Sequence, residues 1–298
     1  MDRPDLAQLA RDDVVSAATL RRAGHDPGAV AAGVRSGALV PLIRGWYAVR
    51  PPRDARDGHW LRTIAALRRY DLRAAASHTS LVIAQGLPDY RLDLSTVHLT
   101  RSSPGVTRSG TEVKIHRPIG VDLAGADRVP TAIGVVQAGL EGVPLSALVA
   151  ADAALRRRLV TVDELRSACD VLARCRGIGP VRAILREADP RIESPGESIV
   201  GHRLRALGFV LDPQFRVVTD DGEKFADFRI RGTRVLVEFD GAEKYATKAA
   251  GFAEKRREDA MRRRGHFFAR YVWAELNDVA LIAARAEQAI ADSRRWRG

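Results

Sequence analysis

Three carboxylates toward the end of the chain have the types and the spacing of a cation site. Glu238 and Asp240 stand two residues apart in an apolar segment whose alternating pattern predicts a β-strand. Because successive side chains point to opposite faces of a strand, both carboxylates emerge on one face, roughly 7 Å apart along the backbone. Asp227 lies eleven residues before Glu238, in a second expected strand at 224–230. If residues 230–234 turn the chain back, Asp227 comes alongside Glu238.

Crowded carboxylates repel one another, so they must take up protons or gather a cation. Oxygen ligands with room for water and a phosphate suit Mg²⁺ or Mn²⁺. Such an ion activates water and stabilises the charge on a transferring phosphoryl group. We therefore expect Asp227, Glu238 and Asp240 to bind Mg²⁺ or Mn²⁺. The alternative is that Asp240-Gly241 is an ordinary turn and that these acids simply face solvent at the strand ends.

The elements around these carboxylates predict an α+β domain from residue 191 to residue 298. Ser194 and Pro195 open a helix as N-cap and first helical residue, and Glu197 is placed as the third residue of a capping box. Further elements are expected as strands at 214–218, 224–230 and 234–240, a charged helix at 252–264, a strand at 266–273 and a closing helix at 279–290. The resulting order is α-β-β-β-α-β-α.

Residues 193–277 resemble the very-short-patch-repair-type endonuclease-like domains, a group similar to the PD-(D/E)xK nucleases. The motifs that carry the resemblance are Ser194-Pro195-Gly196-Glu197-Ser198, Val237-Glu238-Phe239-Asp240-Gly241, Lys244-Tyr245 and Glu254-Lys255-Arg256-Arg257-Glu258-Asp259. The resemblance implies a restriction-endonuclease-like core, in which Asp227 and Glu238 bind the metal and Glu197 assists from the first helix. It also implies phosphodiester hydrolysis, with Mg²⁺ or Mn²⁺ as the cofactor.

One position departs from the pattern of that family. The family has lysine two residues after the strand glutamate, whereas this chain has Asp240 there. Our hypothesis is that Lys244 supplies the missing cation, which completes a catalytic set of Glu197, Asp227, Glu238, Asp240 and Lys244. If Lys244 does not reach the site, the fold would be retained without cleavage.

The first 52 residues predict short helices followed by a β-hairpin. The helices are expected at 6–10, 14–23 and 29–35, and the hairpin strands at 38–43 and 46–49. Asp26 and Pro27 cap the third helix, and Arg44-Gly45 forms the turn between the strands. Three helices and a β-wing describe a winged helix, whose third helix enters the major groove of DNA.

This N-terminal segment is similar to the winged helix of AbiEi-type antitoxins, through residues 33–40 and 44–49. Ser77-His78-Thr79-Ser80 and Val97-His98-Leu99-Thr100 are similar to the region that follows that domain in such proteins. The resemblance implies a transcriptional regulator of a toxin–antitoxin system, with a cognate toxin protein as a further partner.

The middle segment, residues 53–190, predicts a mixed α/β domain of unknown role. Amphipathic periodicity predicts its first helix at 60–70, and alternating patterns predict strands further along. His78, His98 and His116 match no metal-ligand spacing, and we interpret them as structural residues. The segment therefore discloses no chemistry of its own.

The charge of the chain favours an anionic partner. The formal net charge is +11 and the pI is about 10.4, and a surface of that sign attracts nucleic acid. The residues expected to contact DNA are Arg21, Arg22, Arg35, Arg44, Lys255 and Arg256. Alanine, glycine and valine dominate the third helix, so we do not expect it to give strong sequence specificity. The alternative interpretation of each arginine is an ordinary solvated surface.

Composition and cysteine content favour a cytoplasmic protein. Hydrophobic residues make up 46% and charged residues 29% of the chain, which is typical of soluble folded protein. Cys169 and Cys175 match no redox or metal spacing, which favours a reducing cytosol. No apolar signal segment opens the chain, and Pro144 with several glycines breaks the most apolar stretch, 131–155. We therefore expect neither secretion nor a membrane span.

The sequence thus predicts a multidomain α+β protein with a winged helix at 1–52, a mixed α/β domain at 53–190 and an endonuclease-like core at 191–298. The first functional hypothesis is a DNA-binding protein whose C-terminal domain hydrolyses DNA with Mg²⁺ or Mn²⁺. The second is a non-catalytic, antitoxin-like regulator that keeps the nuclease fold as a binding platform. The third is an interaction module that neutralises a toxin.

Overall fold

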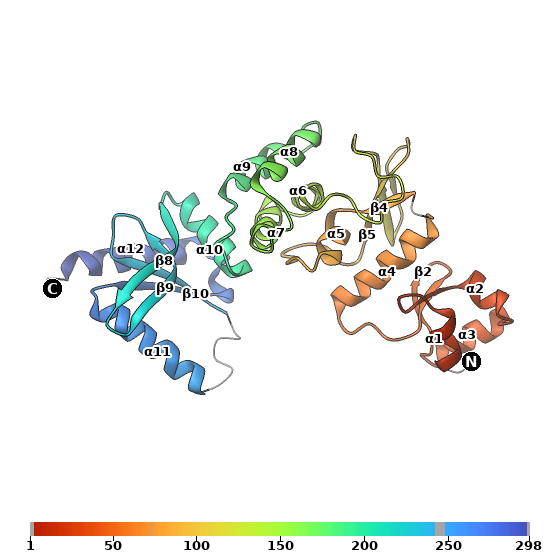
Figure 1. Cartoon of the computed structure of the whole chain (residues 1–298), viewed down its shortest axis with the longest axis horizontal. Helices are drawn as coiled ribbons and strands as arrows, with labels where there is room; N and C mark the ends of the chain where they lie inside the picture. Colours follow the sequence, from red (N-terminus) through yellow and green to blue (C-terminus); the bar gives the residue numbers. More distant parts are fainter. Residues whose placement is uncertain (1–2, 72, 242–247, 297–298) are drawn as a thin grey trace. The chain divides into compact units, whose positions relative to one another are not determined.

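The computed structural model describes residues 3–71, 73–241 and 248–296, which form two compact units (Figure 1). The first unit comprises residues 1–151 and 160–186, and the second comprises residues 152–159 and 187–298. The described residues form twelve α-helices and three β-sheets. The expectation of an α+β chain is therefore confirmed.

The first unit begins with a small sheet flanked by short helices. Its elements are α1 (Arg3–Leu9), β1 (Val14–Ser16), α2 (Ala17–Arg22), α3 (Pro27–Arg35), β2 (Val40–Ile43) and β3 (Trp46–Ala48). The three strands are antiparallel in the order β1-β3-β2, and Leu6, Val15, Leu20 and Leu39 form a core between sheet and helices. The expected hairpin is confirmed, since Gly45 turns the chain between β2 and β3 with a φ of 78°.

The prediction of a helix from Val14 to Ala23 is wrong at its start. Residues Val14–Ser16 form β1, which pairs with β3, and the helix begins only at Ala17. The Ser16 hydroxyl accepts a hydrogen bond from the Thr19 backbone N–H at 3.0 Å, so Ser16 is the N-cap. The two β-branched valines before it favour a strand over a helix.

A second sheet follows in the same unit. Its strands are β4 (Ala74–Ala76), β5 (Val97–Arg101), β6 (Arg108–Ser109) and β7 (Val113–His116). The helices of this part of the chain are α4 (Ala55–Arg69), α5 (His78–Ala84), α6 (Thr131–Glu141), α7 (Pro144–Arg156), α8 (Val162–Val171) and α9 (Ile178–Ile184). The strand order is β4-β5-β7-β6, and β5 and β7 are parallel. Apolar side chains of α4, such as Leu61 and Ile64, pack with Leu99 and Ile115 on one face of this sheet.

Helices α5 and α6 pack together and lie toward the other face of that sheet. On α6, Gln137 donates a hydrogen bond of 3.5 Å to the hydroxyl of Thr100 on β5. Thr100 and His98 are two residues apart on β5, so both point to this face. His98 and Thr100 are therefore polar residues buried beneath these helices.

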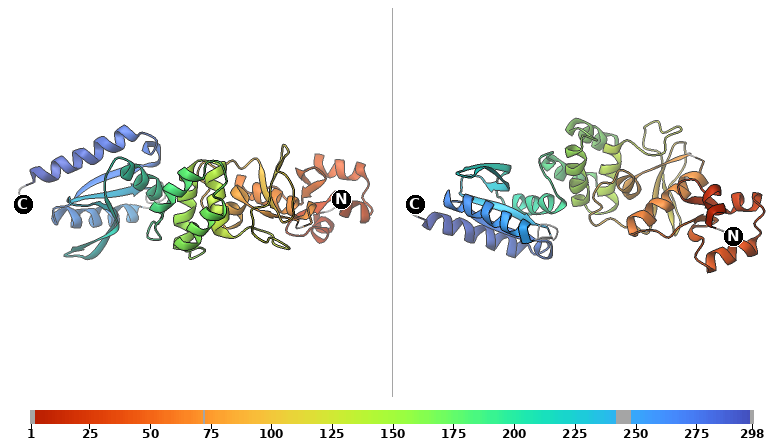
Figure 2. Two further views of the ribbon diagram at one scale, coloured as in Figure 1. Left: turned by 90° about the horizontal axis from the view of Figure 1, so that it is seen from above. Right: turned by 60° about the horizontal axis from the view of Figure 1, so that its bottom comes forward.

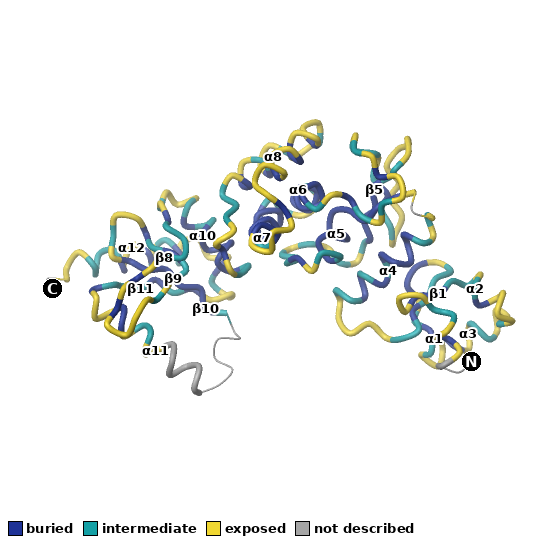
Figure 3. Tube along the Cα trace, viewed as in Figure 1, coloured by how far each residue is buried: buried dark blue, intermediate teal, exposed yellow. Residues whose placement is uncertain are grey.

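The second unit has the predicted order of elements. They are α10 (Pro195–Ala206), β8 (Leu211–Thr219), β9 (Gly222–Ile230), β10 (Val235–Asp240), α11 (Lys248–Arg263), β11 (Phe267–Val272) and α12 (Val279–Arg295). The strand order is β11-β10-β9-β8, with β10 and β11 parallel and the other neighbours antiparallel. Strand β10, which carries two of the predicted carboxylates, is buried along its whole length (Figure 3).

Helices cover both faces of this sheet, with α11 and α12 on opposite sides (Figure 2). Helix α10 packs on the face of Phe239, and a Cβ added at Gly196 would lie 2.1 Å from the Phe239 ring. On the opposite face, Met261 of α11 packs against Leu236. Because residues two apart on a strand share a face, Glu238 points to the same side as Leu236, toward α11.

Candidate functional site

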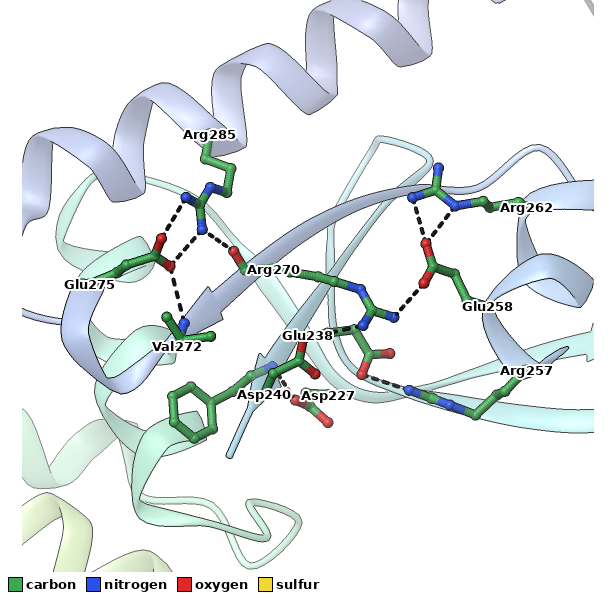
Figure 4. Close-up of polar contacts among 11 residues, drawn as sticks. Asp227, Glu238, Asp240, Arg257, Glu258, Arg262, Arg270, Val272, Glu275 and Arg285 are labelled. Carbon is green, nitrogen blue, oxygen red and sulfur yellow. Dashed lines mark hydrogen bonds and ion pairs between the residues drawn. The ribbon is translucent and has the colours of Figure 1, made fainter. Parts of the chain in front are cut away.

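The acidic side chains of β9 and β10, the two inner strands of the second unit's sheet, lie close together near the C-terminal end of β10 (Figure 4). Val237 pairs with Phe228, which places the next residues of the two antiparallel strands side by side. The Asp227 carboxylate accepts a hydrogen bond from the backbone N–H of Phe239 at 2.6 Å. The structure thus brings Asp227 beside the segment that carries Glu238 and Asp240.

Glu238 is an acidic side chain with no exposed surface, and an arginine stands against it. Its Oε2 accepts a hydrogen bond from Arg257 Nη2 at 2.8 Å, and Arg257 also donates to the Phe225 carbonyl at 2.5 Å. A buried carboxylate loses its hydration, so a cationic hydrogen-bond donor is needed to keep it charged. Arg257 therefore stabilises the ionised form of Glu238.

Asp240 begins a chain of alternating charges that ends on α11 (Figure 4). Its Oδ2 is 3.2 Å from Arg270 Nη1, and Arg270 Nη2 is 3.0 Å from Glu258 Oε2. Glu258 in turn accepts from Arg262 at 2.6 Å. With Asp227 and Glu238, four carboxylates and three guanidinium groups thus gather around β10.

Among the described residues, the three acids are not a group whose ligand atoms all lie within 4.8 Å of one another, so the case for a hard divalent cation rests on the chemistry of the donors. All three predicted ligands are carboxylates, which is the chemistry that Mg²⁺ and Mn²⁺ prefer. Asp240 Oδ1 is buried and accepts no hydrogen bond from the described residues, so its second oxygen is available to an ion. The same side chains are partly neutralised by Arg257 and Arg270, which sequence reasoning did not assign to the site.

A helical signal in the sequence points to Arg257. Arg257 precedes Met261 by four residues, so both lie on one face of α11, and Met261 is fully buried against the sheet. Lys255 and Arg256, which the sequence predicts to contact DNA, are exposed on the same helix. Arg257 therefore points to the sheet, whereas Lys255 and Arg256, the two residues before it, point to solvent.

The remaining members of the predicted catalytic set are placed differently. Glu197 is buried at the start of α10, where its backbone N–H donates to Ser194 Oγ at 3.2 Å. Its carboxylate accepts from the Glu193 N–H at 2.9 Å and from Gln214 at 3.4 Å. These contacts hold the N-terminal turn of α10. Lys244 lies outside the described residues.

The predicted basic surface of the first unit gathers around a cavity of about 640 Å³. Arg21, Arg35 and Arg44 line it, from α2, α3 and the turn between β2 and β3, together with Val34 and Tyr47. Arg22 is exposed beside them and donates to Thr19 at 3.4 Å. Within the described part of the chain, none of these four arginines forms an ion pair with a carboxylate.

The first unit also contains a cluster that sequence reasoning missed. His78, His98 and His116 each offer a ring nitrogen, and these three nitrogens lie within 4.8 Å of one another. His98 Nδ1 is 3.0 Å from His116 Nε2, and the rings of His78 and His116 stack with centroids 3.8 Å apart. The three histidines, which the sequence analysis interprets as structural residues, therefore lie together in one cluster. Their sequence spacing is uninformative because each comes from a different element.

Burial keeps the histidines of this cluster neutral. It lowers the pKa of His78 well below the usual value and lowers the pKa of His116 to about 4. It also lowers the pKa of His98, although the nearby Glu141 carboxylate acts in the opposite direction. Neutral imidazole is the form that binds metals.

Among the described residues, no helix combines the length and the apolar character needed to cross a membrane. No family model and no curated protein matches the chain. One solved structure that does match is the crystal structure of the RV2827C protein from Mycobacterium tuberculosis, which is 18% identical and has a TM-score of 0.34. The match covers 62% of this chain and 80% of that chain, and its TM-score is too low to assign the fold.

Proposed function

We propose that this protein binds DNA and that its second unit hydrolyses phosphodiester bonds with Mg²⁺ or Mn²⁺. The observation that carries the proposal is the approach of Asp227 to the β10 segment that carries Glu238 and Asp240. Two features support a restriction-endonuclease-like core. The elements follow the order α-β-β-β-α-β-α, and the acids lie on neighbouring strands, as they do in such cores.

The chain's own residues would prepare the site in two ways. Asp227, Glu238 and Asp240 would hold the ion, which when bound supplies an activated water and stabilises phosphoryl charge. Arg257 and Arg270, now paired with these carboxylates, place cationic groups where a phosphate would arrive. The buried position of Glu238 keeps bulk water away from it.

The first unit supplies the features expected of a DNA-binding module. Its order of helix, strand, two helices and hairpin is the order of a winged helix. Arg35 ends α3 and Arg44 stands at the hairpin turn, both exposed, and neither guanidinium group forms an ion pair in the described part of the chain. The Arg44 backbone N–H donates to Glu112 Oε2 at 3.3 Å. Contacts from these arginines to phosphates would position the protein without reading sequence.

A plasmid-nicking assay tests the proposal. Wild type should nick supercoiled DNA with Mn²⁺ or Mg²⁺, and Asp227→Asn and Glu238→Gln should each lower the rate at least about 100-fold. Asp220→Asn is the matched control, because Asp220 is an exposed acid of the same unit, paired with Arg264. Equal nicking by wild type and both site variants would mean that the activity is not from this site.

A second candidate function is a non-catalytic regulator of a toxin–antitoxin system, with DNA and a toxin protein as partners. The observation that favours it is that Glu238 and Asp240 each already have an arginine counter-ion. The aspartate at position 240, where the family has lysine, also favours this candidate. DNA binding without metal-dependent nicking, in a protein whose circular dichroism shows a folded state, would select this candidate.

A further inference from the structure

The three-histidine cluster of the first unit is built from one helix start and two parallel strands. His98 on β5 and His116 at the end of β7 share a face of the sheet, because Thr100 pairs with His116 and lies two residues from His98. His78 is the first residue of α5, which directly follows β4. The fold thus brings together three imidazoles that are 20 and 18 residues apart in sequence.

We propose that His78, His98 and His116 form a Zn²⁺ site that is separate from the carboxylate site of the second unit. The nitrogens of His98 and His116 that face each other, Nδ1 and Nε2, are 3.0 Å apart. Tetrahedral zinc with Zn–N bonds of about 2.0–2.1 Å requires ligand nitrogens about 3.3 Å apart. These two rings therefore need only a small shift to accept the ion, and the third nitrogen lies within the same 4.8 Å.

The histidine that completes the set is held by a neighbour. His78 Nδ1 is 2.9 Å from the hydroxyl of Ser77, which leaves Nε2 as the nitrogen directed to the metal. A hydrogen bond on the non-ligating nitrogen is the usual device that orients a metal-binding histidine. The His78 ring stacks on the His116 ring with centroids 3.8 Å apart, so His78 must turn before its Nε2 can share an ion with His116.

The backbone at His78 supports a functional constraint. His78 has a φ of 50°, in the left-handed region that residues with a side chain rarely adopt, and it is buried. Such a conformation costs about 1–3 kcal/mol and persists only where the surroundings require it, often at a ligand site.

The surroundings of the cluster provide room and charge for an ion. A cavity of about 280 Å³ beside His98 is lined also by Thr79, Asp93 and Glu141. Glu141 forms an ion pair with Lys114 at 2.8 Å, so its negative charge lies near the cluster but is partly neutralised by the lysine. Of the three histidines, His98 lines this cavity, together with the cations Arg91 and Lys114. Three nitrogen ligands match zinc with a water as fourth ligand, whereas Mg²⁺ and Mn²⁺ prefer oxygen.

The test is metal binding by the full chain. Protein stripped with a chelator is titrated with Zn²⁺ against a chromophoric competitor, and Co²⁺ is added separately to record its visible spectrum. Wild type should bind one Zn²⁺ at about 1 μM free metal and show the intense bands of tetrahedral Co²⁺. His116→Gln and His98→Gln should each weaken zinc binding at least about 100-fold, while His266→Gln, outside the cluster, should not.

Two further results decide the proposal. Glu238→Gln, in the second unit, should leave the zinc stoichiometry unchanged, which separates this site from the carboxylates. The competing explanation is a buried histidine pair in which one ring donates to the other, as the 3.0 Å contact also allows. Wild type that binds no zinc at micromolar concentrations, or His116→Gln that binds as much as wild type, would overturn the proposal. A loss of plasmid nicking would not bear on it.

Discussion

At the scale of single residues, Arg257 is the side chain that stabilises the buried carboxylate of Glu238 in the second unit. It pairs with Glu238, which has no exposed surface, while Arg257 itself is only 22% exposed. Removal of one partner from a buried ion pair leaves an uncompensated charge in a medium of low dielectric. The pair therefore couples the stability of the unit to the state of its candidate site.

Arg257→Ala should destabilise the protein by about 3–5 kcal/mol, because Glu238 loses its counter-ion. Urea unfolding followed by circular dichroism measures the change. Added Mn²⁺ should restore part of the stability, since an ion at Glu238 would replace the guanidinium group. Arg256→Ala, at the exposed neighbouring position, is the control and should change little. An Arg257→Ala variant as stable as wild type would contradict this role.

A second residue makes stability depend on pH in an unusual direction. Asp152 is 3% exposed, and burial raises its pKa from 3.8 to about 7, although its carboxylate accepts hydrogen bonds from Ser198 Oγ at 2.7 Å and from the Asp189 N–H at 2.8 Å. The folded state binds this proton more tightly than the unfolded state does. Its contribution to stability is therefore full below pH 3.8 and is lost as the pH rises to about 7.

Asp152→Asn should remove this dependence. The stability of wild type relative to the variant should fall by about 4 kcal/mol at most as the pH rises from 4 to 7. Unfolding free energies of both proteins at several pH values measure the difference. The variant loses one acceptor, so its absolute stability is not the readout. A constant difference across this range would show that Asp152 does not titrate there.

At the scale of elements, the sequence predicted what local signals determine. The order of elements along the second unit followed from alternating patterns and from turn residues such as Gly232, which has a φ of 78°. Strand β1 was missed because Val14–Ser16 is held by pairing with β3, more than 30 residues later. Tertiary pairing of this kind overrides local propensity, which is why the helix start was misplaced.

The same difference between local sequence signals and tertiary contacts applies to the candidate sites. Asp227, Glu238 and Asp240 could be grouped because one short turn connects their strands. The histidine cluster could not, since it depends on the parallel pairing of β5 with β7 and on the position of α5. The arginine counter-ions were missed because they come from α11 and β11, elements that only the packed sheet brings to the acids.

Close packing of α10 on β10 gives a prediction at this scale. A methyl group at Gly196 would stand 2.1 Å from the Phe239 ring, so Gly196→Ala should destabilise the protein by about 1–3 kcal/mol or more. Gly179→Ala is the matched control, because Gly179 is also helical and a Cβ there has no atom within 4 Å. Urea midpoints compare the two. Equal midpoints would mean that α10 does not approach β10 so closely.

At the scale of the whole molecule, the net charge of +11 should dominate association with nucleic acid. Each phosphate that the protein neutralises releases counter-ions, so the logarithm of the affinity should fall linearly with the logarithm of the salt concentration. The arginines around the 640 Å³ cavity are exposed and are the best candidates for binding phosphates. Binding that is flat between low and moderate salt would contradict a DNA-binding role.

Replacement of Arg21, Arg35 and Arg44 by alanine should lower the magnitude of the salt slope by up to about 3, roughly 0.9 for each phosphate that is no longer neutralised. Fluorescence anisotropy with a labelled duplex measures the slope. Alanine at Arg166, Arg174 and Arg176, exposed residues on and after α8, removes the same charge and is the control. A control with the same decrease in slope would show that net charge, rather than this surface, is responsible.

The most direct test of the carboxylate site is Mn²⁺ binding by calorimetry, in a His116→Gln background that removes the proposed zinc site. We expect one Mn²⁺ per chain, and at least about 100-fold weaker binding when Asp227→Asn and Glu238→Gln are added. Unchanged Mn²⁺ binding in that variant, or no binding at millimolar Mn²⁺ in its parent, would show that the acids of β9 and β10 hold no metal.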